Sequence, residues 1–387
     1  MKSRRQNVSV ARQTILGRDE NFEPIPIDLV IEIFSRSPVK SIARCRCVSK
    51  LWASTLRLPY FTELYLTKSC ARPRLLFACQ KHRELFFFST PQPHNPNESS
   101  SPLAASFHMK IPFDGRFNII SPIGGLVFVR YEQILKGRKT PEFVSAICNP
   151  STGQSLTLPK PKTRKRIWGT SHFGYDPIEK QFKVLSMNIG DGVYKEHYVL
   201  TLGTENLSWR RIECSIPHVH GSKGICINGV LYYRAKADMF SGTLMIVCFD
   251  VRFEKFSYIK ILKPTTTLIS YNGKLASLVW EGPSYICGKR FEMWVLGDPE
   301  KHEWLKHTYE LRPRWQNVLG EDLLIFAGMT GTNEIVLSPK YPSHPFYVFY
   351  YNLERNTIRR VEIQGMGAFK VNEDYIFLDH VEDVKLI

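Results

Sequence analysis

The feature that most constrains the fold of this chain is a repeat of about 50 residues that fills the sequence after Phe107. Each repeat has a glycine turn leading into an apolar strand, at Gly125, Gly174, Gly229, Gly273 and Gly331. A second hairpin pattern recurs between these turns, as in YVLTLGTENLSWRRIEC and LMIVCFDVRFEKFSYIK. Each repeat therefore predicts two hairpins, or four strands.

A four-stranded unit of this kind can bury its faces only against neighbouring units, which a radial β-propeller provides. The period is that of kelch-like propellers. Five units follow Phe107, and two strands predicted at 75–79 and 85–88 contribute to another, so we expect about six blades. The terminal segment DYIFLDHVEDVKLI is expected to complete a blade and close the ring.

Particular residues in the repeats have specific expected roles. The pairs Asn228-Gly229 and Asn272-Gly273 supply the positive φ that type I′ hairpin turns need. Large rings stand at equivalent points of three units, where we expect them to wedge between neighbouring sheets as core residues: Trp209, Phe256 and Trp304.

The repeat region resembles the F-box-associated domain of plant F-box proteins. The strings that carry the resemblance are NPSTGQSLTLP, FGYDPIEKQFKVLSM, LSWRRIE and ICINGVLYY, within residues 121–364. They indicate fold more than function.

Before the repeats, the stretch from Pro24 to Phe61 changes to helical periodicity. Ser37-Pro38 separates a first helix from a second, and a third ends near Pro59. Their apolar positions are Leu29, Val30, Ile33 and Phe34; Val39, Ile42 and Ala43; and Val48, Leu51, Trp52, Thr55 and Leu56. A unit of about 40 residues cannot bury all of this surface by itself, so part of it is expected to face another surface.

The same stretch resembles the F-box, through Ile25-Pro26, Asp28-Leu29, the Pro38-to-Ser41 run, Arg46-to-Lys50, Trp52 and Pro59. Ser37 and Cys45 depart from the usual Leu and Phe and remove apolar volume. The resemblance implies docking to a Skp-type linker protein and, through it, to a cullin. It maps partner contact onto Pro26, Leu29, Ile33, Pro38, Val39, Val48 and Trp52. The rival interpretation is a helical cap packed on the rest of the chain.

These observations predict an α+β multidomain chain. Residues 1–22 form a basic disordered tail, 23–62 a three-helix F-box, and 63–106 a linker with the first strands and a Pro/Ser-rich loop. Residues 107–387 form a mostly β, kelch-like β-propeller.

The predicted function is that of a substrate-recognition adaptor in a Skp-cullin-F-box (SCF) ubiquitin ligase, with the β domain presenting an unknown target protein for ubiquitination. The alternative is a propeller that binds a small ligand or sugar, with a vestigial F-box. Because no GxSxG string or patterned histidine set is present, we predict no catalytic residues and no cofactor.

The net charge of +16 raises the question of other partners. Nucleic-acid binding is not expected, because most aromatic residues fall inside strand patterns. No apolar run is long enough to cross a membrane, so the chain is predicted to be soluble and intracellular, in the nucleus, the cytoplasm or both. A basic run resembles a nuclear import signal, although it is equally typical of a solvated loop: Lys160, Lys162, Arg164, Lys165 and Arg166.

Nine cysteines without a CxxC pair indicate reduced, mostly buried thiols. A zinc site would draw on Cys214 with His218 and His220, but no second cluster with matching spacing follows. The sequence therefore predicts no metal site.

Overall fold

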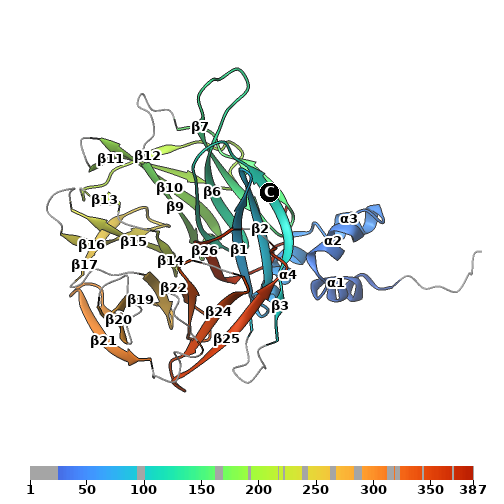
Figure 1. The fold of residues 1–387 in the computed structure, drawn as a ribbon. Helices are drawn as coiled ribbons and strands as arrows, with labels where there is room; N and C mark the ends of the chain where they lie inside the picture. The colour runs from blue at the N-terminus through green and yellow to red at the C-terminus, as the bar shows by residue number, and fades with distance from the viewer. Residues whose placement is uncertain are drawn as a thin grey trace, which may run out of the picture.

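The computed structural model describes residues 25–93, 101–161, 169–190, 193–216, 218–220, 223–237, 243–261, 267–282, 290–311, 318, 323–341, 344–367 and 370–386. Two parts are visible in Figure 1, a helical unit at residues 25–70 and a ring of β-sheets.

The helical unit contains α1 (Ile27–Ser35), α2 (Val39–Cys45), α3 (Lys50–Thr55) and α4 (Pro59–Cys70). Three of these match the predicted helices. The fourth, α4, corrects the sequence-based prediction, which ends the helices near Pro59 and places a link after residue 62. Pro59 does not end a helix but begins α4, because the first turn of a helix tolerates a residue without an N–H.

The described strands form six sheets, which we number as blades 1 to 6. Blade 1 joins β26 (Lys370–His380), β1 (Arg74–Lys81), β2 (Glu84–Pro91) and β4 (Ser106–Pro112). Blade 2 joins β5 (Phe117–Ile123), β6 (Leu126–Gln133), β7 (Glu142–Asn149) and β8 (Gln154–Thr157). Blade 3 joins β9 (Gly169–Asp176), β10 (Gln181–Gly190), β11 (Val193–Thr201) and β12 (Arg210–Ile212).

Blade 4 joins β13 (Val219–His220), β14 (Ile225–Ile227), β15 (Val230–Lys236), β16 (Leu244–Asp250) and β17 (Phe256–Lys260). Blade 5 joins β18 (Thr267–Tyr271), β19 (Lys274–Trp280), β20 (Arg290–Asp298) and β21 (Glu303–Glu310). Blade 6 joins β22 (Leu324–Met329), β23 (Glu334–Pro339), β24 (Phe346–Asn352) and β25 (Thr357–Gln364), with β3 (Leu103–Ala104) added parallel to β25.

The C-terminal strand closes the ring, as the sequence predicts. β26 pairs antiparallel with β1, so one blade is built from both ends of the propeller sequence. The strands that contact the neighbouring blades follow one another in a closed order: β26, β5, β9, then β14 and β15 of blade 4, β18, β22 and back to β26. The propeller therefore starts at Arg74, and β1 and β2 contribute to a blade, as expected for the strands predicted at 75–79 and 85–88.

The hydrophobic core of the propeller lies between the blades. Six clusters of buried residues each combine side chains of two adjacent blades, for example Leu185 and Met187 of blade 3 with Tyr233 and Phe249 of blade 4. This is the consequence of sheets that are apolar on both faces.

The expected turn and wedge residues are confirmed. Asn228 and Asn272 have φ of 49°, and the glycines that follow have φ of 83° and 74°. Trp209 packs between blades 2 and 3 and donates its indole N–H to the Pro159 carbonyl at 2.6 Å. Trp304 does the same between blades 4 and 5, to the Lys260 carbonyl at 3.1 Å, and Phe256 packs between blades 3 and 4.

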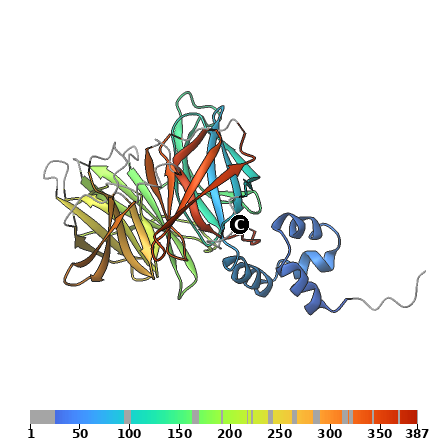
Figure 2. The same ribbon diagram turned by 60° about the horizontal axis from the view of Figure 1, so that its bottom comes forward.

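Figure 2 shows that the helical unit lies to one side of the propeller, joined to it through α4, with the C-terminus at the junction. Within the described residues, no helix is both long and apolar enough to span a bilayer.

Candidate functional site

The helical unit has two apolar sides. Its inner side is a core in which Ile42, Leu56, Phe61 and Tyr65 are fully buried. Ser49 caps α3 by accepting a hydrogen bond from the Trp52 backbone N–H at 3.1 Å. These contacts hold the short helices in place and decide which side chains remain outside.

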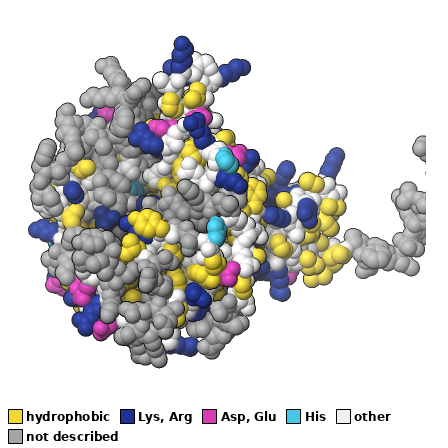
Figure 3. Space-filling view, in the orientation of Figure 1, with side chains coloured by type: hydrophobic (Ala, Val, Ile, Leu, Met, Phe, Trp, Pro, Cys, Tyr) yellow, Lys and Arg dark blue, Asp and Glu magenta, His cyan; other side chains and the backbone are white. Residues whose placement is uncertain are grey.

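The outer side carries large apolar residues that the chain itself leaves exposed. The most exposed are Val48 and Tyr60, both at 66%, followed by Leu51 at 63%. Leu29 and Ile33 of α1 are 55% and 56% exposed. We call the whole set the outer apolar surface: Ile25, Ile27, Leu29, Ile33, Val48, Leu51, Leu58 and Tyr60. Figure 3 shows hydrophobic side chains gathered at the end of the helices away from the propeller. Exposed apolar groups this concentrated are typical of a protein interaction site.

The structure divides the residues to which the sequence assigns partner contact. Pro26, Leu29, Ile33, Pro38 and Val48 are exposed. Val39 is only 4% exposed, and Trp52 is half-buried, with its ring 5.0 Å from that of Phe34 in an edge-on contact. Val39 and Trp52 therefore stabilise the helical unit, whatever a partner contacts.

Sequence reasoning missed five members of the outer apolar surface: Ile25, Ile27, Leu51, Leu58 and Tyr60. Leu51 is one of the apolar positions of the third predicted helix, and the spacing gives no signal that it faces outward. Leu58 and Tyr60 flank Pro59, where the sequence predicts the end of the helices.

The C-terminal segment fastens the helical unit to the propeller. Val384 is fully buried in the helical core. Arg46 donates hydrogen bonds to the carbonyls of Leu56 and Val384, at 2.7 and 2.8 Å. On the propeller side, the Asn149 amide donates to the carbonyls of Asp383 and Lys385. One short segment therefore binds both parts.

A cavity of about 330 Å³ lies beside this segment, where the helices face the propeller. Ser37 and Pro38 line it together with Arg72, Arg74 and His108. Ser37, one of the two departures from the F-box pattern, thus lies on the propeller side of the helices. Its carbonyl accepts the Tyr65 hydroxyl at 3.1 Å.

A larger groove of about 910 Å³ opens on blades 2 and 3. Its lining mixes aromatic and charged groups: the Arg130 guanidinium stacks 4.4 Å from the centre of the Phe143 ring, and Trp209 closes one side. The Arg116 backbone N–H donates to the Glu132 carboxylate, the Arg116 guanidinium pairs with it, and both lower the pKa of Glu132. Such a lining suits a polypeptide segment that has both apolar and charged side chains.

Lys160 also lines this groove and pairs with the Glu142 carboxylate. The other members of the basic run lie outside the described residues: Lys162, Arg164, Lys165 and Arg166.

A buried cluster of possible metal ligands lies between blades 3 and 4. Donor atoms of His197, Cys214 and His218 lie within 4.8 Å of one another. The sequence pattern pointed to Cys214 and His218 but missed His197, because β11 brings it in from an earlier part of the chain. The side chain of His220 lies outside the described residues.

The buried thiols of the propeller are not activated as nucleophiles. Burial raises the pKa of Cys79, Cys148 and Cys248 to about 12 in each case. A catalytic cysteine needs the opposite shift.

Comparison with known proteins finds a family match for the propeller and for the helical unit. Residues 74–381 match the F-box associated beta propeller domain, and residues 22–64 match the F-box domain. F-box protein At5g65850 of Arabidopsis thaliana is 49% identical over 405 residues, covering 100% of this chain and 99% of that protein. F-box protein At3g61340 of the same plant is 45% identical over 415 residues, covering 100% and 99%.

Among solved structures, the β-propeller domain of the Trilobed protease from Pyrococcus furiosus covers 63% of this chain and 70% of its own, at 13% identity and a TM-score of 0.41. The match to both domain models, over nearly all of the described chain, agrees with the helical unit and six-bladed ring seen in the structure. The chain belongs to the plant F-box proteins that carry an F-box associated β-propeller domain.

Proposed function

We propose that this protein is the substrate-recognition adaptor of an SCF ubiquitin ligase. In this proposal the F-box docks on a Skp-type linker protein, the linker binds a cullin, and the propeller holds the target protein. The chain supplies no catalytic group, because the ligase complex performs the ubiquitin transfer. The observation that carries the proposal is the outer apolar surface, which the chain leaves uncovered while its inner core is complete.

The energetics favour a protein partner for this surface. Burying one Leu or Ile side chain contributes about 1.5–3 kcal/mol, so a few such residues supply a useful binding free energy. The exposed Arg44, Lys50 and Arg57 lie in the same helical unit. They favour a linker whose rim is acidic, because complementary charge speeds association and orients the partner.

The junction with the propeller supports the adaptor geometry. Because Val384 and Arg46 fasten the F-box to the propeller, a target bound on the blades is held in a defined position relative to the ligase. The groove on blades 2 and 3 is the proposed target site. A target segment with apolar and acidic side chains would suit its aromatic residues and the guanidinium groups of Arg116 and Arg130.

The direct test is purification of the tagged full chain from plant cells, followed by detection of the linker and the cullin. We expect both to co-purify with the wild type and to be lost from a Val48→Asp/Leu51→Asp variant. If neither co-purifies with the wild type, the adaptor proposal fails and the ligand-binding propeller with a vestigial F-box becomes the better interpretation.

The target site is tested by proximity labelling with the full chain. Replacing Phe143 and Arg130 by Ala should remove the labelling of a subset of proteins while linker binding persists. An unchanged set of labelled proteins would place target binding elsewhere on the propeller.

We further propose that the basic run acts as a nuclear import signal. Replacing Arg164, Lys165 and Arg166 by Ala should then move the protein toward the cytoplasm. An unchanged distribution in fluorescence microscopy would leave the run as a solvated loop.

A further inference from the structure

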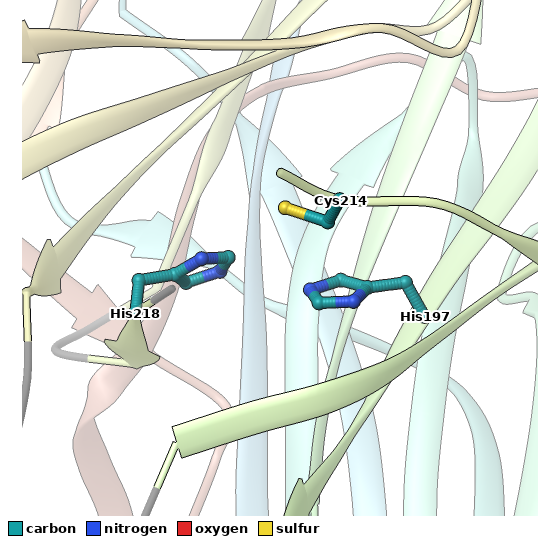
Figure 4. Close-up of side chains that lie close together, drawn as sticks. All are labelled: His197, Cys214 and His218. Carbon is teal, nitrogen blue, oxygen red and sulfur yellow. The ribbon is translucent and has the colours of Figure 1, made fainter. Parts of the chain in front are cut away.

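The cluster of His197, Cys214 and His218 combines residues from a strand and from a connection between blades. His197 belongs to β11 of blade 3, directly opposite Met187 of β10. Cys214 and His218 lie in the segment between β12 and β13, which carries the chain into blade 4. Figure 4 shows the two imidazole rings on opposite sides of a gap, with the sulfur of Cys214 beside it.

The His197 side chain points into this gap (Figure 4). It is 2% exposed, and among the described residues no hydrogen-bond partner is found for its Nε2. Its ring centre is 5.5 Å from that of His218. A buried nitrogen with no hydrogen bond costs free energy, so its retention calls for an explanation.

His218 is held in a defined orientation. Its Nδ1 lies 2.7 Å from the Ile216 carbonyl, and its Nε2 lies 2.9 Å from the Tyr233 hydroxyl of blade 4. The Cys214 thiol donates to the same Ile216 carbonyl at 3.4 Å. Histidines that bind metals commonly keep one such partner on the ring nitrogen that does not bind, which fixes the ring.

We propose that His197, Cys214 and His218 bind one thiophilic d10 metal ion, Zn²⁺ or Cu⁺. Two imidazoles and one thiolate form a donor set for either ion. Metal–nitrogen and metal–sulfur bonds of about 2.0–2.3 Å require the donors to approach more closely than 4.8 Å, which rotation of the side chains can supply. One nitrogen of His218 exchanges its hydrogen bond for the metal, and the other keeps its partner.

Coordination releases one proton. The Cys214 thiol gives up its hydrogen as the metal–sulfur bond forms, and no group is oxidised or reduced. Both histidines bind as neutral imidazoles, so only the thiol proton is released. The resulting complex carries a charge of +1 with Zn²⁺ and is neutral with Cu⁺, which favours Cu⁺ at a buried site without a carboxylate ligand.

The bound ion would cross-link blades 3 and 4. It would connect β11 of blade 3 to the segment that enters blade 4, at a point where Tyr233 of blade 4 already contacts His218. The site therefore makes the stability of this blade junction depend on the metal.

The test uses the metal-free full chain, titrated separately with Zn²⁺ and with Cu⁺ under reducing conditions. The wild type should bind about one ion per chain. Cys214→Ser and His197→Gln should each weaken binding by about a hundredfold or more, since even the loss of an outer partner costs 10–100-fold. The matched control is Cys226→Ser, which changes another half-buried cysteine at the edge of blade 4 and should bind like the wild type.

Two further measurements keep the result interpretable. Co²⁺ should give a sulfur-to-metal charge-transfer band with the wild type and none with Cys214→Ser, and competition between Zn²⁺ and Cu⁺ identifies the preferred ion. Melting of the metal-free variants shows that they fold. The proposal is overturned if folded Cys214→Ser or His197→Gln binds both ions as tightly as the wild type, or if Cys226→Ser weakens binding equally.

Discussion

At the scale of single residues, His380 shows how burial sets the acid sensitivity of the propeller. Its side chain is 3% exposed on β26, and burial, reinforced by His108 and Arg74, lowers its pKa to about 3. As pH falls below about 6.5, the unfolded chain takes up a proton on this histidine while the folded chain does not. Stability is therefore complete above pH 6.5 and is lost as pH falls from there toward 3.

Replacing His380 by Gln should remove part of this acid sensitivity. Between pH 6.5 and 4.5 the wild type should lose about 1.4 kcal/mol per pH unit through this group, because one pKa unit corresponds to that free energy. Denaturant unfolding of both proteins at several pH values measures the difference in slope. If the stability of the wild type and of His380→Gln changed with pH in parallel over this range, the difference in proton binding assigned to His380 would be contradicted.

Residue-level predictions from the sequence were sound where a local rule decides the outcome. Asn-Gly turns and wedge aromatics depend on local backbone preference and on position within the repeat. The burial of Val39 is not decided by a local rule. The spacing places it on the apolar face of its helix, but it cannot show whether the core or a partner covers that face. For the same reason the sequence separates Leu29 from Val30 only through a family resemblance.

At the scale of elements, the C-terminal segment is the part that the sequence described least. It was expected to complete a blade, which β26 does, but the residues after His380 continue into the F-box core. The seven residues after His380 are too few to give a periodic signal, so the burial of Val384 could not be predicted. α4 was missed for a related reason, since its apolar residues show almost no one-sided helical pattern.

Replacing Val384 by Ser should loosen the F-box from the propeller. The side chain is fully buried, and its loss should destabilise the helical core by about 2 kcal/mol. The control is Leu386→Ser two residues away, where 40% of the side chain is already exposed. Hydrogen exchange of α1 and α4 measures the effect. Equal protection in the two variants would contradict the role given to Val384.

At the scale of the whole molecule, the ring depends on one closing strand. A chain cut after Gly367 lacks β26 and leaves β1 without one of its partners, so we expect it to lose cooperative unfolding. A chain beginning at residue 72 lacks the F-box but keeps all six blades, and it should keep a single transition. Scanning calorimetry compares the two. A cooperative transition in the cut chain would show that five blades and an open sheet suffice.

The overall architecture was largely predictable because the propeller repeats one physical solution several times. A repeat of about 50 residues with two hairpins constrains blade number and packing even where individual strands are weak. The complete cluster of possible metal ligands was not predictable. His197 lies in β11 and His218 in the segment that leads into blade 4, and the two meet only in the folded ring. The spacing of residues along the sequence can reveal a site only when a single segment supplies all of its side chains.

The central claim is that the outer apolar surface binds a Skp-type linker protein, and linker affinity tests it most directly. The comparison is between the wild type, Leu29→Asp/Ile33→Asp, and Phe253→Asp, which changes a 67% exposed residue of the propeller. Losing two buried side chains and burying two charges should weaken binding by at least about a hundredfold, since each 1.4 kcal/mol is tenfold. We predict this loss with an unchanged thermal melt, and wild-type affinity for Phe253→Asp. Wild-type affinity in the double variant would contradict the claim.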